Sequence, residues 1–268
     1  MKHLIHNIEV NGVSAALHCY IPDAAPHAQY QTNRPAVIVF PGGAYKGLYG
    51  GEAEPIALQY LAAGACAFVL YYSVFPARFP QALLEGLSAV RFVREKAEEY
   101  GIDPQKIAVC GFSAGGHLAA STGTQWNKDC LNGLLEGDRS LYRPDKMILC
   151  YPVTSYKSHN GSYKNLVEGN AEELTPEMLK ILSVDENVDA DTPPAYLWHN
   201  CDDKAVLVGE TLLFAKKLCD NGVPVEVRIY PKGGHGTCLG NYITKGREFG
   251  NNNPCEGWVS DTLPFLFR

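Results

Sequence analysis

The sequence has no apolar run long enough to cross a membrane. Its longest, residues 61–72, contains Gly64 and reaches only about half the length that a bilayer requires. The first residues also lack the apolar core and the small-residue cleavage site of a secretory signal. From these absences we expect a cytoplasmic protein with no membrane partner.

Charge of one sign is not concentrated anywhere in the chain. The 268 residues include 23 Lys and Arg against 29 Asp and Glu, which gives a formal net charge of −6. Binding to a phosphate backbone requires clustered positive charge. The sequence therefore predicts no nucleic-acid partner.

Motifs for metals and dinucleotides are also missing. There is no His-x-His, no His-Glu-x-x-His, no Gly-x-Gly-x-x-Gly and no Cys-x-x-Cys. The nine cysteines are an odd number, and Cys66, Cys110 and Cys150 lie inside apolar runs, where a thiol behaves as a small hydrophobic group. We expect free thiols, no metal site and no cofactor.

Short apolar runs that favour β-structure recur along the chain. They lie at residues 36–40, 65–72, 106–110, 146–151, 195–199 and 225–230. Helical patterns at 81–100 and 209–221 separate some of these runs. Because strands that are apolar on both faces alternate with helices, the sequence predicts an α/β fold with a mostly parallel central sheet covered by helices on both faces.

A single domain over residues 1–268 is the organisation that this pattern favours. The segment through Tyr20 is expected to add antiparallel edge strands. Residues 152–194 are too many for a simple connection and carry their own helical pattern near 176–182. We expect residues 152–194 to form a short cap, or lid, inserted into the domain.

A nucleophile elbow is indicated by Gly-Phe-Ser-Ala-Gly at residues 111–115. The motif follows an apolar strand and opens a helix of small residues. Such a turn is sharp and strained, so that the serine hydroxyl projects above the sheet. The sequence therefore predicts Ser113 as the catalytic nucleophile.

A serine hydroxyl becomes a good nucleophile when a histidine takes its proton and a carboxylate orients that histidine. His235 lies in a glycine-rich loop after the strand at 225–230, and two carboxylates, Asp202 and Asp203, follow the strand at 195–199. The chain order serine, acid, histidine fits this fold. We predict His235 as the base and one of the two aspartates as the acid, whereas His117 and His199 are expected to be packing or supporting groups.

An oxyanion hole is the third requirement of this chemistry, because negative charge develops on the substrate carbonyl. Ala114 follows the nucleophile directly and offers one backbone N–H. A glycine turn follows the strand at 36–40, so Gly43 and Ala44 are predicted to offer the others.

These residues together resemble the α/β-hydrolase superfamily, and within it the small bacterial esterases related to acetyl esterases and acetyl-xylan esterases. The resemblance covers nearly the whole chain. Besides the elbow and the histidine loop at 233–236, it is carried by Pro41-Gly42-Gly43-Ala44-Tyr45, Gly51-Glu52-Ala53-Glu54-Pro55, Tyr71-Tyr72-Ser73-Val74, Thr192-Pro193-Pro194 and Trp198-His199.

The resemblance also implies which aspartate is the acid. In that family the acid lies four residues after a strand histidine and three before a valine, and His199 and Val206 give Asp203 these spacings. By the same comparison Ser113 is the nucleophile, His235 the base, and Gly43, Ala44 and Ala114 are the oxyanion donors. The chain departs from related enzymes at residues 41–44, where they read His-Gly-Gly-Gly, and at Leu207, where many have proline.

The activity implied by the resemblance is that of a serine esterase acting through an acyl-enzyme. Its substrate would be a small acyl ester, above all an acetyl ester, of a sugar or oligosaccharide. An arylformamidase, a general carboxylesterase, a small peptidase and a non-catalytic hydrolase-like receptor are the alternatives, and a homo-oligomer is left open.

Aromatic side chains are expected to help bind a sugar. We predict four of them in the substrate site, with ordinary core packing as the alternative: Tyr45, Tyr72, Phe112 and Tyr151. Trp258 and the asparagines at 251–253 are expected to form a rim on the alcohol side.

Overall fold

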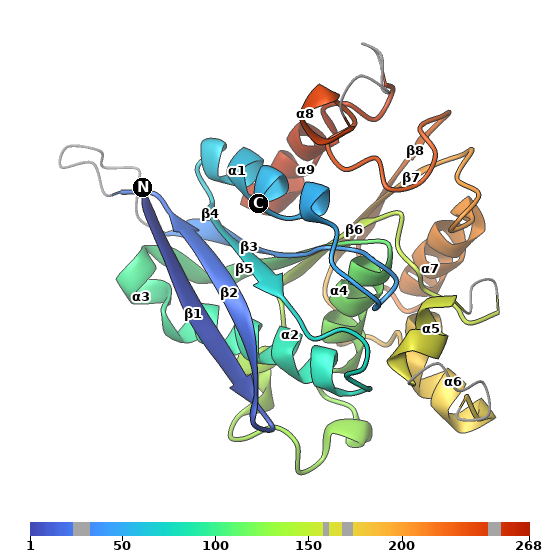
Figure 1. The fold of residues 1–268 in the computed structure, drawn as a ribbon, viewed down its shortest axis with the longest axis horizontal. Coiled ribbons are helices and arrows are strands. Elements are labelled where there is room, and N and C mark those ends of the chain that lie inside the picture. Colours follow the sequence, from blue (N-terminus) through green and yellow to red (C-terminus); the bar gives the residue numbers. More distant parts are fainter. Residues whose placement is uncertain (24–32, 158–160, 168–173, 246–252) are drawn as a thin grey trace.

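A computed structural model describes residues 1–23, 33–157, 161–167, 174–245 and 253–268 (Figure 1). Its centre is an eight-stranded sheet with the strand order β1-β2-β4-β3-β5-β6-β7-β8. The strands are β1 (Lys2–Val10), β2 (Val13–Ile21), β3 (Arg34–Phe40), β4 (Cys66–Tyr71), β5 (Ile102–Phe112), β6 (Lys146–Cys150), β7 (Ala195–Asn200) and β8 (Val225–Tyr230).

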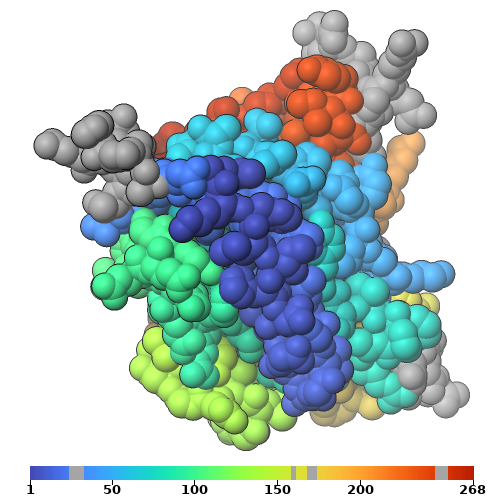
Figure 2. Space-filling view, turned by 60° about the vertical axis from the view of Figure 1, so that its left-hand side comes forward, coloured from blue at the N-terminus to red at the C-terminus, as the bar shows by residue number. Residues whose placement is uncertain are grey.

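The sheet is parallel from β4 through β8 and antiparallel at its N-terminal edge. β1 pairs with β2, and β2 with β4, in antiparallel register, whereas every later pair is parallel. Figure 2, turned so that this edge of the sheet comes forward, shows β1 in dark blue at the front of the molecule. The predicted mostly parallel sheet with antiparallel N-terminal strands is confirmed.

Helices connect the parallel strands and close the chain. They are α1 (Glu54–Ala62), α2 (Gln81–Glu95), α3 (Ala97–Tyr100), α4 (Ala114–Gln125), α5 (Gly161–Leu166), α6 (Pro176–Leu182), α7 (Val208–Asp220), α8 (Tyr242–Lys245) and α9 (Trp258–Phe267). The helix expected over 81–100 is divided at Lys96, whose φ of −92° and ψ of 6° depart from helical values.

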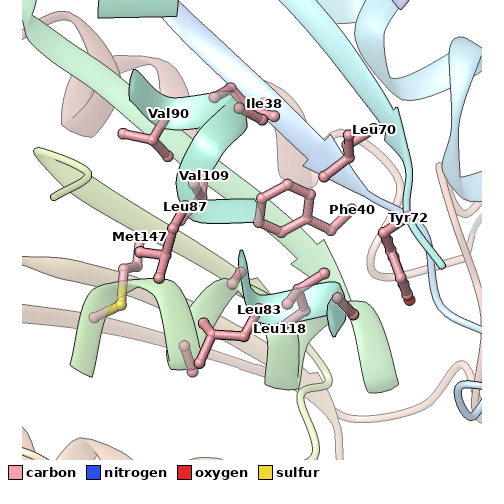
Figure 3. Packing of buried hydrophobic residues seen from close by; sticks show 14 of the residues in the cluster. Ile38, Phe40, Leu70, Tyr72, Leu83, Leu87, Val90, Val109, Leu118 and Met147 are labelled. Carbon is pink, nitrogen blue, oxygen red and sulfur yellow. The ribbon is translucent and has the colours of Figure 1, made fainter. Parts of the chain in front are cut away.

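Two apolar layers hold these helices against the sheet. On one face, α2 and α4 pack on alternate residues of the central strands. Figure 3 shows Leu83, Leu87 and Val90 of α2 close to Ile38 and Phe40. On the other face, α1 and α9 cover the intervening residues, which include Val37 and Val39 of β3. Each fully buried aliphatic side chain of this kind stabilises the fold by about 1.5–3 kcal/mol.

The parallel strands all end at the same edge of the sheet, and the segments that follow β3, β5, β7 and β8 carry the predicted site residues. In such sheets ligands bind beyond the carboxyl ends of the strands. All nine cysteines are free thiols. None of the helices in the described ranges is long and apolar enough to span a bilayer.

Candidate active site

Ser113 occupies the turn between β5 and α4. Its φ of +52° and ψ of −116° are a strained conformation for a residue with a side chain. Glycines make this turn sterically possible, because a Cβ on Gly111 would stand 2.0 Å from the carbonyl oxygen of Gly115, and one on Gly115 would stand 2.1 Å from that of Phe40. The turn therefore holds the serine at the carboxyl edge of the sheet.

A continuous hydrogen-bonded chain links Ser113, His235 and Asp203. The Nε2 atom of His235 lies 2.9 Å from Oγ of Ser113, and its Nδ1 atom lies 2.7 Å from Oδ2 of Asp203. Since Nδ1 faces a carboxylate, it carries the ring hydrogen, and Nε2 accepts the bond from the serine hydroxyl. This tautomer is the one that a general base next to a serine requires.

The Asp203 carboxylate is fully buried and receives hydrogen bonds on both oxygens. Its Oδ1 atom accepts from the backbone N–H groups of Ala205 and Val206, at 2.9 and 3.0 Å. Its Oδ2 atom faces His235 and also lies 3.3 Å from Nε2 of His199. Burial alone would raise the pKa of Asp203, but the hydrogen bonds from His199 and His235 outweigh it and hold the pKa well below its usual range. The Asp203 carboxylate is thus kept ionised beside the imidazole of His235.

Asp202 faces a different partner. Its Oδ1 atom accepts from the backbone N–H groups of Gly233 and Gly234, at 2.9 and 2.8 Å, while the residue itself is exposed. Asp202 therefore stabilises the loop that carries His235 without contacting its imidazole. The two adjacent carboxylates are separated in role because they point to different sides of the chain.

The loop after β3 forms a second wall beside Ser113. Gly43 and Ala44 line a pocket of about 430 Å³ together with Ser113 and His235. In the described part of the chain, the backbone N–H groups of Gly43, Ala44 and Ala114 donate to no other protein group. These three N–H groups are therefore available to a ligand at the mouth of the elbow, as an oxyanion hole requires.

Small residues and a few polar side chains make up the rest of the pocket wall. Tyr49, Glu52 and Ser162 supply the polar part, and Val206 is the largest aliphatic residue among the described residues that line it.

The four aromatic residues expected in the substrate site lie instead in the protein interior. Tyr45, Tyr72, Phe112 and Tyr151 are each at most 2% exposed, and none of them lines the pocket around Ser113. The tyrosine hydroxyls have buried partners: that of Tyr45 lies 2.7 Å from Nδ1 of His117, and that of Tyr72 donates to the carbonyl oxygen of Pro41 at 2.6 Å. Their burial corrects the expectation, because rings that are closed off from the pocket cannot stack on a sugar.

Trp258 is also placed differently from the expectation. It is fully buried, and its Nε1 atom donates to the carbonyl oxygen of Cys238 at 2.7 Å, so the prediction that it forms a rim is wrong. Residues 251 and 252 of the same predicted rim lie outside the described residues.

Two residues of the site make contacts that the sequence analysis did not specify. Glu52 contacts the loop after β3 through the backbone N–H of Gly42, and His199 contacts the carboxylate of Asp203. His199 was expected only to pack or support, and the spacing from His199 to Asp203 was the one local signal for its contact. Nothing near Glu52 in the sequence indicates its contacts. Within the described ranges, no three His, Cys, Asp or Glu side chains gather where they could hold a metal ion.

A serine on a strained strand-to-helix turn, bonded to a histidine that is bonded to a buried carboxylate above a mostly parallel sheet, defines an α/β-hydrolase. Residues 23–218 match the BD-FAE family, and the chain belongs to this family. The match confirms the resemblance to α/β-hydrolase esterases that the sequence predicted.

Individual relatives agree with this placement. The chain is 36% identical to the acetyl ester-xyloside bifunctional hydrolase of Caldicellulosiruptor lactoaceticus, whose crystal structure superposes with a TM-score of 0.77 over 96% of this chain and 90% of that one. It is 34% identical to endo-1,4-beta-xylanase B of Butyrivibrio fibrisolvens over 78% of this chain and 33% of that protein. It is 26% identical to an acetylxylan esterase of Xylanibacter ruminicola over 90% of this chain and 47% of that protein. The chain thus spans between a third and a half of the length of these two curated relatives.

Proposed function

We propose that the chain removes short acyl groups, acetyl foremost, from esters of sugars or oligosaccharides. The observation that carries this proposal is the hydrogen-bonded chain from Ser113 through His235 to Asp203 beside a pocket of about 430 Å³. Relatives that are an acetylxylan esterase and an acetyl ester-xyloside hydrolase support an acetylated carbohydrate as substrate.

The reaction follows from the positions of these groups. Oγ of Ser113 attacks the carbonyl carbon of the ester while Nε2 of His235 takes its proton, and the carbonyl oxygen becomes an oxyanion. The N–H groups of Gly43, Ala44 and Ala114 stabilise that oxyanion. Each such donor is typically worth about 2.7–4 kcal/mol in the transition state. The tetrahedral intermediate collapses when His235 returns the proton to the leaving alcohol oxygen, which leaves an acyl-enzyme and a free alcohol.

Hydrolysis of the acyl-enzyme repeats these steps with water. His235 takes a proton from water, the hydroxyl attacks the acyl carbon, and the proton then returns to Oγ of Ser113 as the carboxylic acid leaves. Asp203 keeps the imidazole in its working tautomer and stabilises the imidazolium that forms in both halves of the cycle.

The segment 152–194 acts in this proposal as a cap beside the acyl group. Ser162 of α5 lines the pocket, and the side-chain amide of Asn165 donates to the carbonyl oxygen of Ala44 at 2.7 Å. These two residues connect the cap to the loop after β3 that carries Gly43 and Ala44, which we call the oxyanion loop. Parts of the segment, residues 158–160 and 168–173, lie outside the described residues.

Short acyl groups are expected to react fastest. The largest aliphatic side chain on the described wall is that of Val206, so an added methylene gains less than the roughly 0.8 kcal/mol of burial that a wall of large apolar side chains would give. We expect kcat/KM for nitrophenyl acetate to exceed that for nitrophenyl butyrate by at least about tenfold. Release of acetate from acetylated xylo-oligosaccharides is expected in the same preparation. A preference for butyrate, with acetylated sugars untouched, would instead indicate a general carboxylesterase.

Tyr49 is expected to contribute to binding of the sugar. The residue lines the pocket mouth and is 44% exposed, and its ring lies against Gly51, where an added Cβ would come within 3.2 Å of the ring carbon Cε1. A held, exposed ring of this kind suits stacking on a sugar, worth about 1 kcal/mol or five- to tenfold in affinity.

We expect Tyr49→Ala to raise KM for acetylated xylo-oligosaccharides by about five- to tenfold. KM for ethyl acetate, which has no ring to stack, should stay within about twofold. Tyr49→Phe keeps the ring and serves as the control. Equal changes for both substrates would show that Tyr49 shapes the pocket without recognising the sugar.

A further inference from the structure

Glu52 is a buried carboxylate that the reaction sequence leaves without a role. It ends the short 3₁₀ helix Gly50–Glu52, it is 2% exposed, and it lines the pocket that contains Ser113. Carboxylates are costly to bury and are kept in protein interiors where directed hydrogen bonds compensate them. One oxygen accepts a hydrogen bond from the loop after β3, and the other is connected to the loop that carries His235 through the hydroxyl of Tyr151.

The first of these segments is the oxyanion loop. Oε2 of Glu52 accepts from the backbone N–H of Gly42 at 2.8 Å. Gly42 is confined between this oxygen and the elbow, because a Cβ placed on it would lie 2.8 Å from Oε2 of Glu52 and 2.7 Å from the carbonyl oxygen of Phe112. Glu52 therefore fixes the residue that directly precedes the predicted donors Gly43 and Ala44.

The second segment is the loop that carries His235. Oε1 of Glu52 accepts from the hydroxyl of Tyr151 at 2.6 Å, and that hydroxyl in turn accepts from the backbone N–H of Cys238 at 3.2 Å. The Tyr151 ring lies 5.1 Å from the His235 ring at an interplanar angle of 67°. Burial, with the nearby charge of Glu52, raises the pKa of Tyr151 well above its usual value, so the phenol stays a donor.

We propose that Glu52 is a positioning residue that sets the oxyanion loop and the histidine loop at a fixed separation around Ser113. The inference rests on the proposed esterase function. One carboxylate satisfies two donors, the Gly42 N–H and the Tyr151 O–H, and bonds to an ionised acceptor are shorter and stronger than neutral ones. Preorganised N–H groups stabilise an oxyanion only when they are already aimed at it.

Glu52→Gln is the sharpest test, because it preserves size and removes one acceptor. The glutamine NH₂ either faces the Gly42 N–H, where a donor opposes a donor, or donates to the Tyr151 hydroxyl, which then loses the charged acceptor that its own proton faces. We expect kcat for nitrophenyl acetate to fall by about 10- to 100-fold while KM changes by less than about threefold. Glu54→Gln is the matched control, since Glu54 bonds to the hydroxyl of Tyr20 at 3.2 Å and does not line the pocket.

A second measurement separates positioning from a general loss of structure. In a thionoester, sulfur replaces the carbonyl oxygen that the oxyanion hole holds, so a weakened hole should harm the ester more than its thio analogue. We expect the ester-to-thionoester ratio of kcat/KM to fall at least about tenfold in Glu52→Gln and to stay unchanged in Glu54→Gln. Equal losses on both substrates would overturn the proposal.

Tyr151→Phe tests the hydrogen-bonded link from Glu52 through Tyr151 to Cys238 even if the Glu52 variant folds poorly. It removes only the contact toward the histidine loop, so a loss of about tenfold or less in kcat is expected. The double variant should be no worse than Glu52→Gln alone by more than about twofold, because both changes break one bridge. Additive losses, or a rise in kcat on removal of the charge, would overturn the proposal.

The failure of this inference can be told apart from the failure of the proposed function. A wild-type chain with no esterase activity would overturn the proposed function as well, whereas an unimpaired Glu52→Gln enzyme would overturn this inference alone.

Discussion

Ser113→Ala is expected to lower kcat for nitrophenyl acetate by about 10⁴-fold or more, with little change in the thermal unfolding midpoint. The variant removes the one hydroxyl that lies 2.9 Å from Nε2 of His235 and keeps the backbone turn that Gly111 and Gly115 allow. Steady-state hydrolysis and circular dichroism of the same preparations would measure both quantities.

Ser88→Ala is a suitable control for that experiment. Ser88 lies on α2, in a surface pocket remote from the site, so its removal should leave the rate within about twofold. Hydrolysis by Ser113→Ala within tenfold of the wild-type rate would contradict a serine nucleophile at this position.

The second large effect is expected from Asp203→Asn, with a loss in kcat of about 10⁴-fold. Oδ1 of Asp203 accepts from two backbone N–H groups and Oδ2 from two histidines, so an asparagine amide meets donors whichever way it is turned. When the NH₂ faces His235, the imidazole must turn to its other tautomer, and Nε2 can then no longer take the serine proton.

Asp202→Asn provides the matched comparison. A single oxygen, Oδ1, accepts from both Gly233 and Gly234, and asparagine retains one such oxygen. We expect a loss of less than about tenfold for Asp202→Asn. If Asp202→Asn proved the more damaging of the two changes, Asp203 would not be the orienting acid.

The strands and the nucleophile could be predicted because their signals are local. Apolar runs with β-forming residues mark β3, β4, β6, β7 and β8 almost to their ends, and Gly-x-Ser-x-Gly between a strand and a helix describes the elbow by itself. The start of β5 was placed four residues late, at 106 instead of Ile102. The polar segment Asp103-Pro104-Gln105 interrupts the apolar pattern there, although the backbone is already extended.

The acid could not be chosen from local pattern alone. Asp202 and Asp203 are neighbours after the same strand, and only the resemblance to known esterases separated them. What separates them physically is direction: one side chain turns inward to His235, the other to the backbone of the glycine loop. Such a difference depends on the tertiary structure.

The aromatic residues were misplaced for a related reason. A tyrosine near a predicted strand end can face a ligand or the interior, and the choice depends on whether its hydroxyl finds a buried partner. The partners here are distant in sequence: Tyr45 is 72 residues from His117, and Tyr151 is 99 residues from Glu52. These pairings bury the rings, and they leave the pocket wall to residues that include Tyr49 and Glu52.

Covalent labelling of the nucleophile tests the central claim most directly. An organophosphate ester such as diethyl nitrophenyl phosphate would be attacked by an activated serine and leave a stable diethylphosphoryl group on Oγ. Intact-mass analysis followed by peptide mapping would locate the adduct while residual esterase activity is followed in parallel. We expect one adduct per chain, on Ser113, with activity lost in proportion to labelling and no adduct on Ser113→Ala. Labelling at another residue, or full activity in a chain labelled at Ser113, would contradict the assignment of Ser113, His235 and Asp203 as the catalytic groups.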